Sequence, residues 1–325
     1  MKRLPSSILV ATLVAVLAGC AGSTGGLGTV PTAPPTPSAD PTGPDLTPVP
    51  SGLPASSTGP SGEPGSSPGP TQSPATSPAG TMLVRAYFVL GGDPGSVGLV
   101  PVLREVPKTA QVATAAMGAL LTGPTADESS ERTITSAVPA GTRLVGISIK
   151  NGLATVDLST EFESGGGSAS MHDRLAQVVY TLTQFSTVKS VVFQIEGQTV
   201  TVFGSEGISL DGPVGRADYK DQLPAIFVDR PAYGAALGNP GRVSGNADVF
   251  EATFRVTILD AAGKSLVDQQ VIATCGTGCR GTFDMMLSYT VAKGQYGTLR
   301  VYNLSAKDGT PEDVRDYRVW LTPAS

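Results

Sequence analysis

The sequence predicts an α+β domain followed by an all-β sandwich, with a long disordered segment before both of them. Residues 21–80 consist almost entirely of Pro, Ser, Thr, Gly and Ala, so they contain too few large apolar side chains to build a core. Between 83 and 203, strand and helix periodicities alternate, which is typical of an α+β domain. From 226 to 321 the pattern consists of strands alone, in seven short runs, and that spacing favours a β-sandwich.

The first twenty residues have the order of a secretory signal peptide. Lys2 and Arg3 precede an apolar run from Ile8 to Leu17. That run is about ten residues long, whereas a helix needs roughly twenty to cross a bilayer. We therefore expect residues 1–19 to be removed from the mature protein and not to remain as a transmembrane span.

This stretch ends in Leu17-Ala18-Gly19-Cys20, which resembles the lipobox of bacterial lipoproteins. The resemblance implies cleavage before Cys20 and attachment of diacylglycerol to its thiol, with acyl chains such as palmitate holding the protein in the membrane. The alternative is an ordinary signal peptide that happens to end near a cysteine. The expected location is the extracytoplasmic side of the cell membrane, with a lipid anchor in place of a transmembrane helix.

Residues 20–80 are expected to form a disordered tether between the lipid and the folded domains. Proline-rich segments favour extended polyproline II at roughly 3.1 Å per residue, so about sixty residues reach on the order of 190 Å when taut. A tether of that length is long enough to cross a layer of cell wall.

Cys275 and Cys279 remain as a pair once Cys20 is assigned to lipid, and an oxidising compartment favours a disulfide between them. The intervening Gly276-Thr277-Gly278 permits a tight turn, and closing so small a loop stabilises by only about 2 kcal/mol. Zinc is the alternative, but it generally needs three or four protein ligands, and the one histidine, His172, is far away in the sequence. We therefore expect neither a metal nor a cofactor.

The α+β domain is predicted to contain two helices among six strands. The clearer helix runs from Ser170 to Phe185, where apolar residues recur at helical spacing, and Ser170 with Asp173 resembles a capping box at its start. Asn151-Gly152 between two alternating runs is a strong hairpin signal. In chain order, the predicted elements are strands over 83–90 and 99–106, a helix over 111–121, strands over 143–150 and 153–159, the helix over 170–185, and strands over 188–195 and 199–203.

The sandwich is predicted from short runs rich in strand-forming residues between turn signals. A polar stretch from Gly204 to Leu223 separates it from the α+β domain, so the expected domain bounds are 82–205 and 224–323. The predicted strands cover 226–230, 242–245, 250–259, 265–274, 282–289, 298–305 and 315–321.

Three acidic residues make the best case for catalysis. Asp157, Glu161 and Glu163 share one parity if their strand continues, and at roughly 3.3 Å per residue Glu161 and Glu163 fall within the about 5 to 9 Å that glycoside cleavage needs. The alternative is a polar strand edge that faces water, opposite the buried Val156, Leu158 and Phe162. This alternative explains the alternation without chemistry.

His172 is the one histidine that a hydrolase could use. The side chains of His172 and the adjacent Asp173 diverge on a helix, and no G-x-S-x-G elbow supplies a serine nucleophile. A solvated histidine at the start of a helix is the simpler interpretation. We therefore predict no catalytic residue.

Aromatic residues in or beside the sandwich strands offer a platform on which a sugar could stack, although core packing explains such rings more often. They are Tyr289, Tyr296, Tyr302, Tyr317 and Trp320. Nucleic acid is not an expected partner, because the net charge is -5 and there is no basic surplus to neutralise phosphates. The glycines between 91 and 98 do not form G-x-G-x-x-G, so no dinucleotide site is expected.

Several motifs of the α+β domain resemble the GerMN domain of GerM-like spore-germination lipoproteins. They are Gly123-Pro124-Thr125, Ala137-Val138-Pro139-Ala140-Gly141-Thr142, Ala154-Thr155-Val156-Asp157-Leu158-Ser159 and Tyr180-Thr181-Leu182-Thr183-Gln184-Phe185. The later motifs Asn239-Pro240-Gly241-Arg242-Val243-Ser244-Gly245, Ala247-Asp248-Val249-Phe250-Glu251-Ala252 and Gly281-Thr282-Phe283 look like the Gmad family, an immunoglobulin-like domain that accompanies GerMN. The two resemblances cover nearly all of residues 82–323, and they imply a GerMN-like α+β domain followed by an immunoglobulin-like sandwich.

The resemblance implies an envelope protein linked to sporulation or germination, whereas the absence of a second GerMN copy departs from the tandem pattern of some GerM proteins. With the expected anchor and tether, it favours a non-catalytic module that binds envelope proteins or acts as a scaffold, and exposed sheet edges are the expected docking surface. The alternatives are a peptidoglycan-binding module and a wall-directed hydrolase that uses Glu161 and Glu163.

Overall fold

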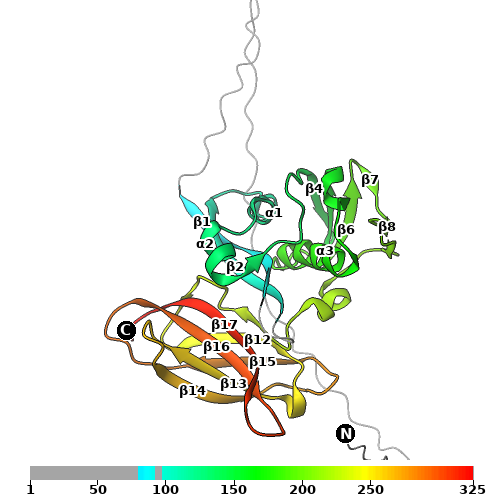
Figure 1. The fold of residues 1–325 in the computed structure, drawn as a ribbon. Helices are drawn as coiled ribbons and strands as arrows, with labels where there is room; N and C mark the ends of the chain where they lie inside the picture. Colours follow the sequence, from blue (N-terminus) through cyan, green and yellow to red (C-terminus); the bar gives the residue numbers. More distant parts are fainter. Residues whose placement is uncertain (1–79, 92–96, 325) are drawn as a thin grey trace, which may run out of the picture. The chain divides into compact units, whose positions relative to one another are not determined.

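The computed structural model describes residues 80–91 and 97–324 (Figure 1). The predicted signal peptide, Cys20 and all of the predicted tether except Gly80 lie outside the described residues. The first part of the chain contains β1 (Thr81–Leu90), β2 (Gly98–Pro107), α1 (Val112–Thr122), α2 (Ala126–Arg132), β3 (Ile134–Thr135), β4 (Leu144–Lys150), β5 (Leu153–Leu158), the 3-10 helix η1 (Thr160–Glu163), α3 (Ser168–Leu182), β6 (Ser190–Ile195), β7 (Gln198–Thr199), β8 (Val202–Phe203) and β9 (Ile208–Ser209).

Two main sheets make up this α+β domain, one ordered β2-β1-β3 and one ordered β4-β5-β6-β7. Within the second sheet β5 and β6 are parallel, and α3 connects them. Helix α3 packs against β1, β6 and α1, and ten of its fifteen residues are buried. The apolar stripe that predicts this helix therefore marks the centre of the core.

The predicted start of α3 is wrong by two residues, and the capping box predicted there is also wrong. The helix begins at Ser168 with Gly167 as N-cap, and no side chain caps it, so Ser170 and Asp173 do not form a capping box. A capping box forms instead on α2, between Thr125 and Glu128. Helix α2 has only seven residues and carries no apolar stripe, so hydrophobic periodicity does not predict it.

The hairpin predicted at Asn151-Gly152 is confirmed. Asn151 and Gly152 have φ angles of 51° and 84°, as a two-residue type I′ turn requires, and they join β4 to β5. The strand predicted over 199–203 is instead divided between β7 and β8, because β7 pairs with β6 whereas β8 pairs with β9.

The second part of the chain contains strands almost alone, in two sheets. It comprises the 3-10 helix η2 (Arg216–Gln222), β10 (Ile226–Arg230), β11 (Ala236–Leu237), β12 (Gly241–Ala247), the 3-10 helix η3 (Phe250–Ala252), β13 (Thr253–Leu259), β14 (Ser265–Ile272), β15 (Gly281–Leu287), β16 (Gln295–Leu304) and β17 (Pro311–Leu321). The sheets are ordered β10-β12-β15 and β11-β17-β16-β13-β14. The predicted fold class, an α+β domain followed by a β-sandwich, is confirmed.

Residues 204–223 are part of the folded structure and not a plain polar connection between the domains. Leu210, Tyr219 and Leu223 are buried, and η2 brings Arg216 onto α3 through a 2.9 Å hydrogen bond from its Nε to the Thr183 hydroxyl. These apolar residues are spaced irregularly between glycines and charged residues, so no periodic pattern predicts their burial.

Candidate functional site

The three acidic residues singled out for catalysis do not line a continuing strand, which corrects the expectation. β5 ends at Leu158, and Glu161 and Glu163 lie on η1. The buried guanidinium of Arg174 holds this turn in place, because it donates to the Phe162 carbonyl at 2.5 Å. Because the chain turns after Leu158, Asp157, Glu161 and Glu163 do not lie on the same face of one strand. The polar strand edge given as the alternative is absent for the same reason.

Each of the three carboxylates has a local structural contact. Asp157 accepts a hydrogen bond from the Gly197 amide at 3.0 Å, and Glu163 accepts one from the Gly204 amide at 3.4 Å. Glu161 forms an exposed ion pair with Arg143 at 3.3 Å. These contacts hold the surrounding loops, so they explain the presence of the three acidic residues without a substrate.

His172 lies in the first turns of α3. Its Nδ1 lies 2.8 Å from the carbonyl oxygen of Ser168, within the same helix. Among residues 80–91 and 97–324, no group of three or more His, Cys, Asp or Glu side chains is placed to hold a metal ion.

Cys275 and Cys279 are joined by a disulfide, with their Cα atoms 5.8 Å apart. The closed loop supports the turn before β13, since the amide of Thr277 donates to the Val249 carbonyl at 3.1 Å and its hydroxyl accepts from the Glu251 amide at 3.2 Å. The disulfide loop therefore lies against the turn in which Glu251 and Ala252 both have positive φ.

The aromatic residues of the sandwich separate into core and surface. Tyr289 and Tyr317 are buried, and their hydroxyl groups bond to the backbone of Leu237 and Val228. Tyr296 and Trp320 are 45% and 38% exposed on the outer face of the five-stranded sheet, with ring centroids 5.0 Å apart. Tyr302 is intermediate in exposure.

The two exposed rings do not present an open stacking platform. The Arg318 guanidinium lies over the Tyr296 ring, 3.7 Å from its centroid. The backbone of Gly294 packs against the Trp320 indole so closely that a Cβ on Gly294 would lie 2.8 Å from it. A flat stack of a sugar on either ring would compete with these contacts.

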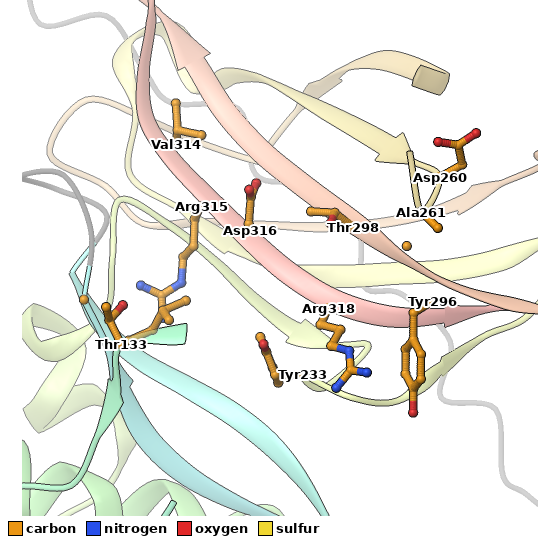
Figure 2. A pocket seen from close by; sticks show the side chains of 13 residues that line it. Thr133, Tyr233, Asp260, Ala261, Tyr296, Thr298, Val314, Arg315, Asp316 and Arg318 are labelled. Carbon is orange, nitrogen blue, oxygen red and sulfur yellow. The ribbon is translucent and has the colours of Figure 1, made fainter. Parts of the chain in front are cut away.

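A polar hollow of about 620 Å³ opens beside this pair (Figure 2). Its sandwich wall comes from β16, β17 and the turn at Asp260, and its other wall comes from the end of β1 and from Thr133. Figure 2 shows Arg318 and Tyr296 side by side at its rim, with Thr298 and Asp316 on the neighbouring sheet surface.

Charged and polar side chains join the two domains at a junction. At this junction Asp229, on β10, accepts a 2.6 Å hydrogen bond from the Tyr87 hydroxyl of β1. Arg85 and Arg216 lie 3.2 and 3.7 Å from the same carboxylate. Burial by itself would raise the pKa of Asp229, but Arg85 and Arg216 outweigh it and hold that pKa below its usual range.

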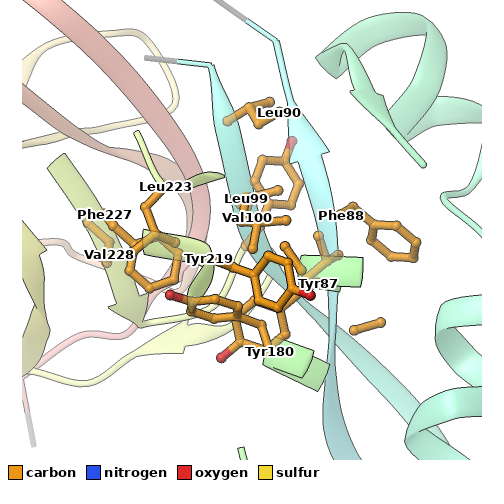
Figure 3. Packing of buried hydrophobic residues seen from close by; sticks show 14 of the residues in the cluster. Tyr87, Phe88, Leu90, Leu99, Val100, Tyr180, Tyr219, Leu223, Phe227 and Val228 are labelled. Carbon is orange, nitrogen blue, oxygen red and sulfur yellow. The ribbon is translucent and has the colours of Figure 1, made fainter. Parts of the chain in front are cut away.

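Apolar packing continues through the junction (Figure 3). The Tyr180 ring of α3 lies 5.5 Å from the Tyr87 ring and meets Phe227 of β10 edge to face at 6.0 Å. Burial raises the pKa of Tyr180 to about 12, so its hydroxyl stays protonated at neutral pH. The cores of the α+β domain and the sandwich are therefore continuous.

Backbone contacts reinforce the junction at β2. Buried Arg315 of β17 donates from Nη2 to the carbonyl groups of Gly98 and Leu99, at 3.0 and 2.7 Å. Gly98 has a φ of +143°, and a Cβ there would lie 2.7 Å from the Gln222 carbonyl oxygen. Tyr233 adds a parallel bridge to Val102. A sequence pattern cannot reveal this junction, because it depends on contacts between distant parts of the chain, such as Tyr87 and Asp229, which are 142 positions apart.

An open sheet edge lies at β4, on the other side of the α+β domain core. β4 is the terminal strand of its sheet and pairs only with β5 among the described residues. Val145 and Ile149 are 51% and 38% exposed. The alternation in the sequence predicts one apolar face, but the pairing with β5 shifts by one residue between Leu144 and Gly146, so Val145 does not share the face of Ile147 and Ile149.

Comparison with protein families assigns both domains. Residues 85–201 match the Germane family, described as sporulation and spore germination, and residues 225–310 match Gmad2, the immunoglobulin-like domain of bacterial spore germination. Neither description names a catalytic activity. No curated protein gives a significant match in sequence.

No helix within 80–91 and 97–324 combines the length and apolarity that a membrane span needs.

Solved structures give weak similarities. The first GerMN domain of the sporulation protein GerM from Bacillus subtilis is 21% identical, covers 42% of this chain and is covered over 99% of its own length, with a TM-score of 0.35. The tandem GerMN domains of the same protein are 15% identical and cover 64% of this chain and 62% of theirs, with a TM-score of 0.37.

A putative lipoprotein from Clostridium perfringens is 19% identical, over 46% of this chain and 97% of its own, with a TM-score of 0.31. TM-scores this low support no further conclusion. The family matches do, and they confirm the resemblance inferred from the sequence: residues 85–201 are a Germane domain and residues 225–310 a Gmad2 domain, so this chain combines two domains of sporulation and spore-germination proteins.

Proposed function

We propose that this chain is a lipid-anchored extracytoplasmic protein whose Germane and Gmad2 domains act together as a non-catalytic protein-binding unit of the cell envelope. The observation that carries the proposal is the open edge of β4. The amino-terminal motif that resembles a lipobox supports the anchor, and the acidic residues that would support an enzyme have local structural contacts instead.

The β4 edge has the properties of a strand-addition site. In a two-residue hairpin the residues next to the turn, Lys150 and Leu153, form a hydrogen-bonded pair, so Ile147 and Ile149 direct their backbone N–H and C=O groups away from β5. Natural proteins usually block such an edge with proline, charge, a β-bulge or a covering segment, and β4 has one irregularity, between Leu144 and Gly146. Here Lys150 is the one charged residue of the strand, and the other side chains are apolar or small.

The proposed occupant is an extended segment of an envelope protein that carries apolar residues at every second position. Such a segment would continue the sheet through backbone hydrogen bonds and would cover Val145 and Ile149. Because the two domains share one core, a partner that docks at β4 would also position the sandwich.

Crosslinking and mass spectrometry on intact cells test this proposal. The native chain is compared with a Val145→Lys, Ile149→Lys double variant, which places charge at the two large apolar side chains of β4 that are exposed. We expect the crosslinked envelope partners to fall at least tenfold in the variant. The matched control is Ile272→Lys on β14, at a side chain that is 69% exposed, and we expect it to retain the partners.

The anchor is tested separately by Cys20→Ala. The native protein should fractionate with membranes and carry the mass of a diacylglycerol at its amino terminus, and the variant should lose both properties. Equal partner recovery from the double variant and the native chain would contradict docking at β4, whereas membrane association that survives Cys20→Ala would contradict the lipid anchor.

A further inference from the structure

One arginine on the surface of the sandwich lacks the carboxylate partner that its neighbours have. On the outer face of the five-stranded sheet, Arg300 holds Asp316 through bonds of 2.7 and 2.8 Å, and Arg255 lies 2.9 Å from Asp268. Arg318 lies on the same face of β17 as Asp316. In the described part of the chain its guanidinium contacts the Tyr296 ring and forms neither a hydrogen bond nor an ion pair.

The guanidinium of Arg318 is held in one orientation. Antiparallel pairing sets Arg318 opposite Thr298 and sets Trp320 opposite Tyr296, so the cation lies diagonally across from the tyrosine. Stacking at 3.7 Å fixes the plane of the guanidinium, and the contact with Trp320 at 5.0 Å fixes the tyrosine. Stacking occupies the face of a guanidinium and leaves the N–H groups of its edge available, which is the geometry that binds a carboxylate through two parallel bonds.

The charges around the hollow favour a ligand with a single negative charge. Asp316 is neutralised by Arg300, and Asp260 accepts hydrogen bonds from the amides of Ala262 and Lys264, both at 2.9 Å. Arg315 also lines the hollow, but its Nη2 already donates to the Gly98 and Leu99 carbonyls. A doubly charged phosphate would therefore face the two carboxylates with Arg318 as the guanidinium that could bind it. A single carboxylate matches the guanidinium, and the remaining lone pairs of the two aspartates can accept hydrogen bonds from hydroxyl groups.

We propose that this hollow binds a saccharide that carries a carboxylate. The Arg318 guanidinium would take the carboxylate, while the Thr298 hydroxyl and the Asp316 carboxylate would accept from the sugar hydroxyls. The volume of about 620 Å³ lies in the range of small-molecule sites and has room for one or two sugar rings. A peptide ligand is disfavoured, because most of the side chains that line the hollow are polar or charged.

The backbone at the opposite wall supports a binding role. Thr133 closes α2 with a φ of 55°, a conformation that a β-branched residue rarely adopts, and it lines the hollow. Strained backbone of this kind persists where the surrounding structure demands it and is common at ligand sites. The proposal itself rests on Arg318 and the hollow, and it is independent of docking at β4.

Titration of the full chain with D-glucuronate, followed through the arginine Nε–H resonances by nuclear magnetic resonance, tests the proposal. We expect saturable shifts that include Arg318. Glucose tests the need for the carboxylate, and glutarate tests the need for the sugar hydroxyls. Both should bind at least tenfold more weakly than glucuronate, and so should inorganic phosphate.

Arg318→Gln should weaken glucuronate binding at least tenfold. Arg242→Gln, which removes an exposed arginine from the other sheet, should leave binding unchanged. Equal thermal unfolding of the two variants and the native chain verifies that each is folded. Absence of saturable glucuronate binding, full binding by Arg318→Gln, or equal binding of glutarate or phosphate would each overturn the proposal.

Discussion

The Tyr87 hydroxyl donates a 2.6 Å hydrogen bond to Asp229, and this bond joins the first strand of the Germane domain to the first strand of the sandwich. The two residues are 142 positions apart in the chain. Burial raises the pKa of Tyr87, and the nearby Asp229 carboxylate raises it further, so the tyrosine remains a donor at neutral pH. Arg85 and Arg216 keep the acceptor charged, and the bond is therefore a charge-assisted one.

Asp229→Asn should destabilise the protein by about 2 to 4 kcal/mol, because it leaves Arg85 and Arg216 without their partner in a site where the carboxylate is 23% exposed. Urea unfolding at pH 7 measures the change. Asp284→Asn, which removes an exposed carboxylate beside Arg242, is the matched control and should have little effect. An equal response in the two variants would mean that the junction contributes no more than a surface ion pair.

Asp173→Asn should stabilise the protein at neutral pH. Burial raises the pKa of Asp173 from 3.8 to about 6, and the opposing charge of His172 offsets only part of this. The folded state therefore binds this proton more tightly, so the contribution of Asp173 to the free energy of unfolding is highest below about pH 4 and declines as the pH rises through 6.

The expected gain for Asp173→Asn at pH 7 is about 1 kcal/mol, a value reduced for the solvent that reaches this side chain. It should vanish near pH 3.5, where Asp173 is mostly protonated in both states. Unfolding curves collected between pH 3.5 and 7 measure the difference, and a gain that is constant across this range would exclude the titration of Asp173 as its cause.

Gly98→Ala should lower the free energy of unfolding by more than about 2 kcal/mol. The new Cβ would lie 2.7 Å from the Gln222 carbonyl oxygen, and residue 98 has a positive φ. Gly118→Ala is the control. Gly118 is an exposed residue of α1, and a Cβ added there would meet nothing within 4 Å. Because alanine has the higher helix propensity, Gly118→Ala should raise the free energy of unfolding by about 0.5 to 1 kcal/mol. Thermal or urea unfolding distinguishes the two, and equal effects would contradict the tight approach at Gly98.

The Cys275→Ser, Cys279→Ser double variant should have a free energy of unfolding lower by about 2 kcal/mol or less, because the disulfide closes a loop with a sequence separation of only 4. Peptide mass mapping without reduction should show the native pair linked. The loss should be matched by adding a reductant to the native chain and should be absent when the same reductant is added to the variant. Free thiols at both positions in protein purified without reductant would contradict the disulfide.

The strands were predictable because their side chains alternate with a period of two, and Asn151-Gly152 set the hairpin register. Hydrophobic periodicity does not detect the short helix α2, because this helix has no apolar stripe, although Thr125 followed by Glu128 is a start signal for it. The turn at η1 was missed because Glu161, Phe162 and Glu163 continue the alternation of β5 after the backbone has left the sheet.

The junction and the hollow could not be predicted, for a different reason. Asp229, Arg85 and Arg216 lie in three separate elements, and each reads in the sequence as an ordinary charged surface residue. Arg318 is likewise one of several arginines on the sandwich strands. Its lack of a carboxylate partner follows from the register of β16 and β17, which local pattern does not fix.

The position of β1 has a mechanical consequence. β1 pairs with β2 over ten residues, its Arg85 and Tyr87 contact Asp229, and it is the strand through which the chain continues back to residues 1–79. A pull on the amino-terminal side enters the folded part at Thr81 and acts along β1. The force would have to shear the β1–β2 hydrogen bonds and the charged contacts of the junction at the same time. The strand that first takes the force is therefore also the strand that contacts both domains.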